Sequence, residues 1–229
     1  MESAEVTSTT TLADKAYEAL RNEVLSGRLG SAYPILEQEI AGRLNMSRTP
    51  VRSAIQRLIH EDLIERVGRK GIFVKPLTVT DVEQAYEAAE GLEGMLVLLA
   101  TKYASDTKLK ELEAVVREMV NAGSEGNLKR WTECDRQFHQ LIGQLAENPI
   151  ILGFINQVQI VIERVRYLSI SVKPGMPIIS AREHFATVEA MISRDGALAR
   201  RLHQSHWQRV REEVVSILRA SLSGEIVLK

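Results

Sequence analysis

The order of local patterns in the first third of the chain constrains the fold more strongly than any other sequence feature. Three helical patterns and then two short β-like stretches fall at residues 12–26, 37–44, 48–62, 63–66 and 72–75. The two β-like stretches flank the tip Gly68–Gly71, whose glycines suit a tight hairpin turn. Three helices followed by a glycine-tipped hairpin predict a winged helix-turn-helix over residues 12–76.

The remainder of the chain carries helical patterns only. They fall at residues 80–104, 107–122, 128–147, 150–171, 178–194 and 197–222. The breaks between them are short and contain residues that end helices, such as Gly, Pro, Asn and Asp. Short connections favour antiparallel packing of consecutive helices. The predicted fold class is therefore mainly α, with an N-terminal winged helix-turn-helix and a C-terminal six-helix antiparallel bundle.

These patterns divide the 229-residue chain into four parts. Residues 1–11 are rich in Ser and Thr, and we expect them to form a disordered tail. Residues 12–76 form the first domain, residues 77–80 a linker, and residues 81–229 the helical domain. Aromatic residues make up only 5% of a chain that is 45% apolar, and this balance favours helix packing over a β-sandwich.

Composition excludes several classes of protein. No apolar run approaches the ~18–20 residues that a membrane span needs. The N-terminus lacks the basic and apolar regions of a secretory signal. The single cysteine, Cys134, rules out an intrachain disulfide and suits a reducing compartment. We therefore expect a cytoplasmic protein without a membrane partner.

The third helical pattern carries a polar face opposite its apolar stripe of Val51, Ile55 and Leu58. The polar face and its N-cap consist of Ser47, Arg48, Thr49, Arg52 and Gln56. In helix-turn-helix proteins this end of the third helix enters the major groove, where Arg pairs with guanine and Gln with adenine. Ser47, Thr49 and the free N–H groups of the first turn suit a phosphate. The face therefore predicts contacts to bases and to the DNA backbone.

Net positive charge that would favour binding to nucleic acid is concentrated in the first domain and is absent from the chain as a whole. The whole chain has a net charge of −1, but residues 14–76 contain eleven Lys and Arg against eight Asp and Glu. Arg69 and Lys70 at the hairpin tip suit a second run of phosphates or the minor groove. A solvated polar face on an ordinary helix is the alternative. The order of helices, the turn and the basic tip together favour double-stranded DNA.

Four of the five histidines lie in the helical domain, and the spacing of three of them indicates that their side chains lie close together. Asp135 and His139 are four residues apart, so both leave the same face of a helix. His184 and His206 are each eleven residues from Asp195, so they face each other across an antiparallel hairpin. If the helix of Asp135 packs against that hairpin, one carboxylate and three imidazoles converge. Such a set suits a divalent metal such as zinc, nickel or manganese.

His203 lies one turn from His206 and is a candidate substitute ligand or a partner of the ligands. Scattered surface histidines without a metal remain an alternative that spacing alone leaves open.

Residues 13–76 resemble the winged-helix domain of the GntR family of bacterial regulators. The resemblance rests on the stretches 35–41, 47–52 and 68–74, together with Leu58. It implies that the operator is read by Arg48, Thr49 and Arg52, with Arg69 and Lys70 in the wing.

Residues 81–229 resemble the FCD sensor domain of the FadR branch of that family, in the six-helix, vanillate-regulator-like subgroup. The resemblance rests on an Asp-x3-His pattern and two later histidines, present as Asp135, His139, His184 and His206. It implies a small organic acid bound beside a metal ion, with arginines fixing the far end of the acid. The candidate arginines are Arg136, Arg164, Arg166 and Arg182.

The sequence therefore predicts a ligand-controlled transcription regulator, a repressor in preference to an activator, that binds a pseudo-palindromic operator as a homodimer. Two alternatives stay open. The Asp and three His could hold a metal-bound hydroxide in a hydrolase. The metal could instead be structural, in a constitutive DNA-binding protein that no small molecule releases.

Overall fold

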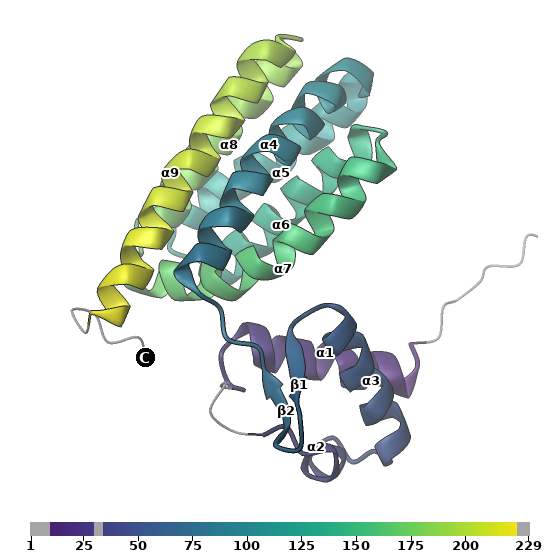
Figure 1. Ribbon diagram of the computed structural model, residues 1–229. Helices are drawn as coiled ribbons and strands as arrows, with labels where there is room; N and C mark the ends of the chain where they lie inside the picture. Colours follow the sequence, from purple (N-terminus) through teal and green to yellow (C-terminus); the bar gives the residue numbers. More distant parts are fainter. Residues whose placement is uncertain (1–9, 30–33, 224–229) are drawn as a thin grey trace, which may run out of the picture. The chain divides into compact units, whose positions relative to one another are not determined.

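The computed structural model describes residues 10–29 and 34–223 of the chain (Figure 1). The chain divides into two compact units, Met1–Pro76 and Leu77–Lys229. Residues 1–9 of the predicted tail and the last six residues of the predicted helical domain lie outside the described part. Thr11, assigned to the tail in the sequence analysis, is the N-cap of the first helix and forms a capping box with Asp14.

Over residues 10–29 and 34–76, the first unit contains three helices and a two-stranded sheet. In chain order they are α1 (Leu12–Leu25), α2 (Glu37–Arg43), α3 (Arg48–His60), β1 (Ile64–Val67) and β2 (Gly71–Val74). Helix α1 packs against α3, and the core between them includes the buried side chains of Leu20, Ile55 and Leu58. The winged helix-turn-helix predicted from the order of patterns is confirmed.

The two strands form an antiparallel hairpin. Its register pairs Ile64 with Val74 and Val67 with Gly71, so both strands are displaced by one residue from the predicted stretches. Ile64 and Val74 are buried, and the backbone N–H of Ile35 donates to the carbonyl of Ile72 at 2.6 Å. Gly68 at the tip has a φ of 48°, which glycine adopts without steric cost.

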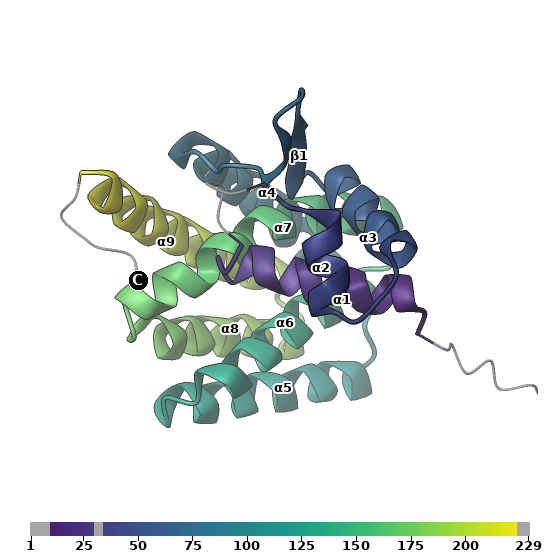
Figure 2. The same ribbon diagram turned by 90° about the horizontal axis from the view of Figure 1, so that it is seen from below.

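The second unit consists, over the described residues, of six helices joined by short connections (Figure 1). They are α4 (Val79–Tyr103), α5 (Asp106–Ser124), α6 (Leu128–Leu145), α7 (Pro149–Val172), α8 (Met176–Ile192) and α9 (Gly196–Leu222). Helix α4 packs against α9, α7 and α6, whereas α5 lies alongside α6 and α8 (Figure 2). The predicted six-helix bundle is confirmed, and α4 occupies a central place in it.

Local signals in the sequence explain where these helices begin and end. Helix α4 starts with a capping box between Thr78 and Asp81, so it includes part of the predicted linker 77–80. It ends where the guanidinium of Arg194 donates to the carbonyls of Thr101 and Ala104, at 2.8 and 2.7 Å. These bonds satisfy carbonyls that a helix end leaves without partners. Among the described residues, no helix combines the length and apolar character that crossing a membrane requires.

Candidate functional site

The candidate DNA-reading face lies on α3, as the sequence predicts. Ser47 is the N-cap residue of α3, although its side chain makes no capping hydrogen bond. The predicted side chains Ser47, Arg48, Thr49, Arg52 and Gln56 are all exposed. The apolar side of the same helix is anchored in the core through Val51, Ala54, Ile55 and Leu58. The polar face is therefore held outward by the packing of its opposite side.

The two arginines of this face are held by residues of α2. The guanidinium of Arg48 donates to the side-chain oxygen of Gln38, and Arg52 forms an ion pair of 3.1 Å with Glu37. Glu37 raises the pKa of the Arg52 guanidinium through this hydrogen bond. Arg52 is exposed, so the ion pair contributes little to stability. The partners on α2 position the two cations along one face.

The wing presents its basic tip to solvent. Arg69 and Lys70 are exposed in the turn between β1 and β2, as predicted. Arg66 on β1 is also exposed and was not among the residues predicted from the sequence, although it lies only two residues before Gly68 at the tip.

The four residues predicted to bind a metal come from three helices of the second unit, and we call them the histidine cluster. Asp135 and His139 lie on α6, His184 on α8 and His206 on α9. Asp135 Oδ1 is 3.3 Å from His184 Nε2 and 3.9 Å from His139 Nε2. One ligand atom of each of these three residues lies within 4.8 Å of the others. The ring of His206 is 4.3 Å from that of His184, so it flanks this group of three.

Burial and missing partners show that the histidine cluster fits a metal ion. His184 is fully buried; its Nδ1 has no hydrogen-bond partner in the described structure, and its Nε2 only faces Asp135 Oδ1 at 3.3 Å. Burial lowers the pKa of His184 to about 4, so the ring is neutral at neutral pH. A buried polar atom without a partner is costly. A neutral imidazole with a free lone pair beside a carboxylate is the form that binds zinc.

Asp135 is held as a carboxylate by Arg166. The guanidinium of Arg166 on α7 lies 2.7 Å from Asp135 Oδ2, and Asp135 is only 3% exposed. Burial alone would raise the pKa of Asp135, but Arg166, His184 and His139 together hold that pKa well below its usual range. Asp135 is therefore ionised and able to coordinate a cation.

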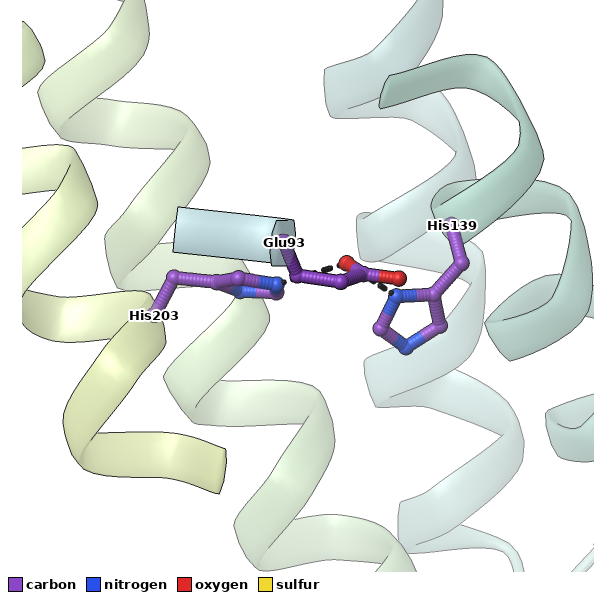
Figure 3. A group of neighbouring side chains, drawn as sticks. All are labelled: Glu93, His139 and His203. Carbon is purple, nitrogen blue, oxygen red and sulfur yellow. Dashed lines mark hydrogen bonds and ion pairs between the residues drawn. The ribbon is translucent and has the colours of Figure 1, made fainter. Parts of the chain in front are cut away.

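Two further carboxylates, neither of them predicted from the sequence, orient the histidines. Glu93 Oε2 is 2.8 Å from His139 Nδ1 (Figure 3), and Glu183 Oε2 is 2.6 Å from His206 Nδ1. A carboxylate on one nitrogen fixes the orientation of the ring and leaves the other nitrogen for a metal. In both rings the remaining nitrogen is Nε2.

Both carboxylates had a signal in the sequence. Glu183 is twelve residues before Asp195, so the hairpin argument that pairs His184 with His206 also brings Glu183 close to His206. Glu93 is the one charged residue of the stretch 91–101 and is therefore buried when that helix packs.

A small cavity adjoins the histidine cluster, with about 40 Å³ of space open to water-sized molecules. Its wall includes Asp135, His139 and His206, together with Arg166 and Trp131. The indole N–H of Trp131 is buried and has no hydrogen-bond partner in the described structure. Most of the remaining wall is apolar or aromatic, and includes Tyr86, Ile162, Ile170, Met176, Trp207, Val210 and Val214.

The four arginines considered for an effector lie in different places. Arg166 lines the cavity. Arg136 and Arg182 are exposed, and Arg164 is half-buried outside the residues that line the cavity. The structure therefore brings one of the four to the histidine cluster.

Both units of the chain match known protein families. Residues 12–74 match the family described as bacterial regulatory proteins, gntR family, and residues 84–209 match the FCD domain. The second match alone covers more than half of the chain. This chain belongs to the GntR family. It is a DNA-binding transcription regulator with an FCD domain, as the resemblance noted in the sequence implied.

Relatives of this GntR-family regulator span most of its length. The HTH-type transcriptional repressor RspR of Escherichia coli is 27% identical over 202 residues, which are 88% of each chain. The probable D-xylose utilization operon transcriptional repressor of Paenarthrobacter nicotinovorans is 28% identical over 194 residues, or 83% of each chain. The solved structure of E. coli McbR/YncC shares the fold, with a TM-score of 0.77, 20% identity, and coverage of 93% of this chain and 100% of that one.

Proposed function

We propose that this GntR-family regulator is a metal-containing repressor that a small organic acid releases from a pseudo-palindromic operator. The observation that carries the proposal is the shared wall between the cavity and the histidine cluster. Asp135, His139 and His206 line the cavity and are three of the four residues of the histidine cluster. A ligand in the cavity therefore contacts the groups that would hold the metal.

We assign the histidine cluster as the metal site. Asp135 and the Nε2 atoms of His139, His184 and His206 supply one oxygen and three nitrogens, a donor set that zinc accepts and that nickel and manganese also tolerate. When bound, the metal supplies a positive charge and an open coordination position. The chain's own carboxylates, Glu93 and Glu183, hold the ligand rings in place.

The cavity favours a small carboxylic acid with an apolar body. Arg166 offers charged N–H groups, and Trp131 offers a buried N–H without a partner. Carboxylates pair well with guanidinium groups, and the apolar remainder of the wall suits a hydrocarbon body. The cavity holds at most a few water-sized molecules, so a larger acid must move the surrounding helices. That movement provides a route from ligand binding to a change in the arrangement of the protein.

On DNA, we propose that α3 enters the major groove and the wing contacts the backbone. Arg48, Arg52 and Gln56 would contact base edges, while Ser47 and Thr49 would contact phosphate. Arg69 and Lys70 would bind phosphate or the minor groove. A homodimer would place two such helices on two half-sites, ~34–36 Å apart when the half-sites are one turn apart. The two relatives named as repressors support repression as the mode of control.

A thermal-shift experiment tests this proposal. The melting temperature of the full-length protein is measured against a panel of small carboxylic and sugar acids, with and without a chelator. We expect chelation to lower the melting temperature and one class of acid to raise it only in the metal-loaded protein. His184→Ala should abolish both effects, whereas His60→Ala, on the exposed side of α3, should leave both unchanged.

The result also separates the proposal from its two alternatives. A drop on chelation without any stabilising acid would indicate a structural metal in a constitutive DNA-binding protein. A hydrolase requires a general base beside the metal-bound water. Glu93 and Glu183 are hydrogen-bonded to the imidazoles that they orient, and this geometry favours sensing over turnover.

A further inference from the structure

A second group of metal-ligating side chains lies beside the histidine cluster. It consists of Glu93 on α4, His139 on α6 and His203 on α9, and we call it the Glu93 group (Figure 3). Glu93 and His203 are buried, and one ligand atom of each of the three residues lies within 4.8 Å of the others. In Figure 3 the carboxylate of Glu93 lies between the two imidazole rings.

The contacts of the Glu93 carboxylate use both of its oxygens. Oε1 accepts a hydrogen bond of 3.1 Å from the amide of Gln159. Oε2 faces His139 Nδ1 at 2.8 Å and His203 Nε2 at 2.9 Å. One oxygen atom is therefore shared by two ring nitrogens. Three potential metal ligands thus lie close around the same small space.

Hydrogen bonds within the protein do not satisfy His203. The indole N–H of Trp207 donates to His203 Nε2 at 3.1 Å, and this bond requires a lone pair on Nε2. The contact of the same nitrogen with the Glu93 carboxylate requires an N–H. A ring nitrogen cannot be both at once, and His203 Nδ1 is buried without a partner in the described structure. A cation between Nε2 and the carboxylate lets both act as ligands without a proton between them, and the lone pair of Nε2 then binds the cation in place of the Trp207 N–H.

The ring of His139 connects this group to the histidine cluster. Its Nδ1 faces Glu93, and its Nε2 faces Asp135 Oδ1 at 3.9 Å. The two nitrogens of an imidazole point away from each other, so one ring can serve two metal ions.

We propose that Glu93, His139 and His203 bind a second divalent metal ion, adjacent to the ion of the histidine cluster and joined to it through the imidazole of His139. Two imidazoles and one glutamate form a known three-ligand zinc set that keeps one coordination position open. Binding of both ions makes His139 an imidazolate, which releases its ring proton to solvent. The proposal shares His139 with the proposed metal site, so the experiment must report on each ion separately.

Cobalt(II) supplies that report, since its visible absorption appears as each site fills. Co²⁺ is titrated into the chelator-stripped full-length protein, and bound cobalt is counted by elemental analysis. We expect wild type to bind two ions per chain. His203→Gln should bind one, and His60→Gln, in the other unit, should still bind two.

Glu93→Gln guards against a folding defect in the His203 variant. It keeps the volume of the side chain and an oxygen that can face Gln159, but removes the carboxylate. Its melting temperature in chelator shows whether it is folded, and we expect one bound ion at saturating Co²⁺.

One ion in wild type that persists in His203→Gln and is lost in His184→Gln would overturn the second site while leaving the proposed histidine cluster intact. Two ions in His203→Gln and in Glu93→Gln would also overturn it. Two ions in wild type, with one lost in His184→Gln and the other in His203→Gln, would support both sites.

Discussion

Replacing Arg166 by methionine isolates the electrostatics of the histidine cluster. Methionine is uncharged and fills the space of the apolar stem of arginine, so it leaves Asp135 buried without its guanidinium partner at 2.7 Å. Removing one member of a buried ion pair costs about 3–5 kcal/mol of stability. This cost applies to buried ion pairs, and Asp135 is only 3% exposed.

Protonation of Asp135 sets an upper limit to this loss of stability, because an unpaired carboxylate can take up a proton instead of staying charged. An aspartate with an ordinary pKa near 4 costs about 4 kcal/mol to protonate at pH 7, at ~1.4 kcal/mol for each unit of pKa. The unpaired carboxylate cannot cost more than its own protonation, so the metal-free variant should lose about 3–4 kcal/mol of unfolding free energy.

The metal-loaded variant should behave differently, because a divalent cation beside Asp135 supplies the missing positive charge. We expect a loss of about 1 kcal/mol or less when the ion is bound, because the apolar stem is kept and the bound ion supplies the charge that Asp135 needs. By the thermodynamic cycle, the difference of about 3 kcal/mol appears as roughly a hundredfold tighter metal binding by the variant.

Urea unfolding with and without saturating Zn²⁺ measures both losses, and competition with a calibrated chelator measures the metal affinity. Arg136→Met is the matched control, since Arg136 lies on the same helix as Asp135 but is exposed. Equal losses with and without Zn²⁺, or weaker metal binding by Arg166→Met, would contradict a metal ion bound at Asp135.

Further outcomes follow from the same structure. Glu183→Gln should weaken metal binding by roughly 10–100-fold, since Glu183 orients His206, and an unchanged affinity by chelator competition would remove that role. The metal-free protein should lose stability as the pH falls from about 6.5 towards 4, because burial lowers the pKa of His184 to about 4 and the unfolded chain then binds the extra proton. The share of His184 is on the order of 3 kcal/mol by urea unfolding, and His184→Gln should remove that share of the pH dependence while leaving the part that the lowered pKa values of His203 and His206 contribute. Arg52→Ala should cost about 1–3 kcal/mol of operator binding and relax base preference, and operator affinity and base preference equal to wild type in fluorescence anisotropy would argue against its role. Lys70→Ala should weaken binding to all DNA sequences and reduce the slope of affinity against salt by about one unit, whereas a wild-type slope would exclude a phosphate contact.

Much of the fold could be predicted from the sequence because its signals are local. Gly68 and Gly71 mark the wing, and Pro, Asn and Gly breaks separate long helical patterns whose apolar stripes face a core. The errors are at the ends. Thr78 and Thr11 act as caps inside segments predicted as linker and tail, since a capping box needs only a Thr and an Asp three residues later.

The histidine cluster was partly predictable for the same reason. Asp135 and His139 share a helix face, and the positions of His184 and His206 are fixed by the turn at Asp195. The contacts of Glu93 were not predictable from spacing, because α4 meets α6 and α9 through packing between elements distant in sequence. The choice among four arginines likewise depended on which helix face lines the cavity.

An acid that stabilises the metal-loaded protein should also release it from its operator. A double-stranded DNA site is selected from a random pool with the full-length protein, and its affinity is measured by fluorescence anisotropy at fixed salt, with each acid that raises the melting temperature. We expect such an acid to weaken operator binding by roughly 5–150-fold in the metal-loaded wild type. We expect no effect in chelator or in His184→Ala. An operator affinity that no stabilising acid changes, or that changes equally without metal, would contradict control by a metal-bound acid.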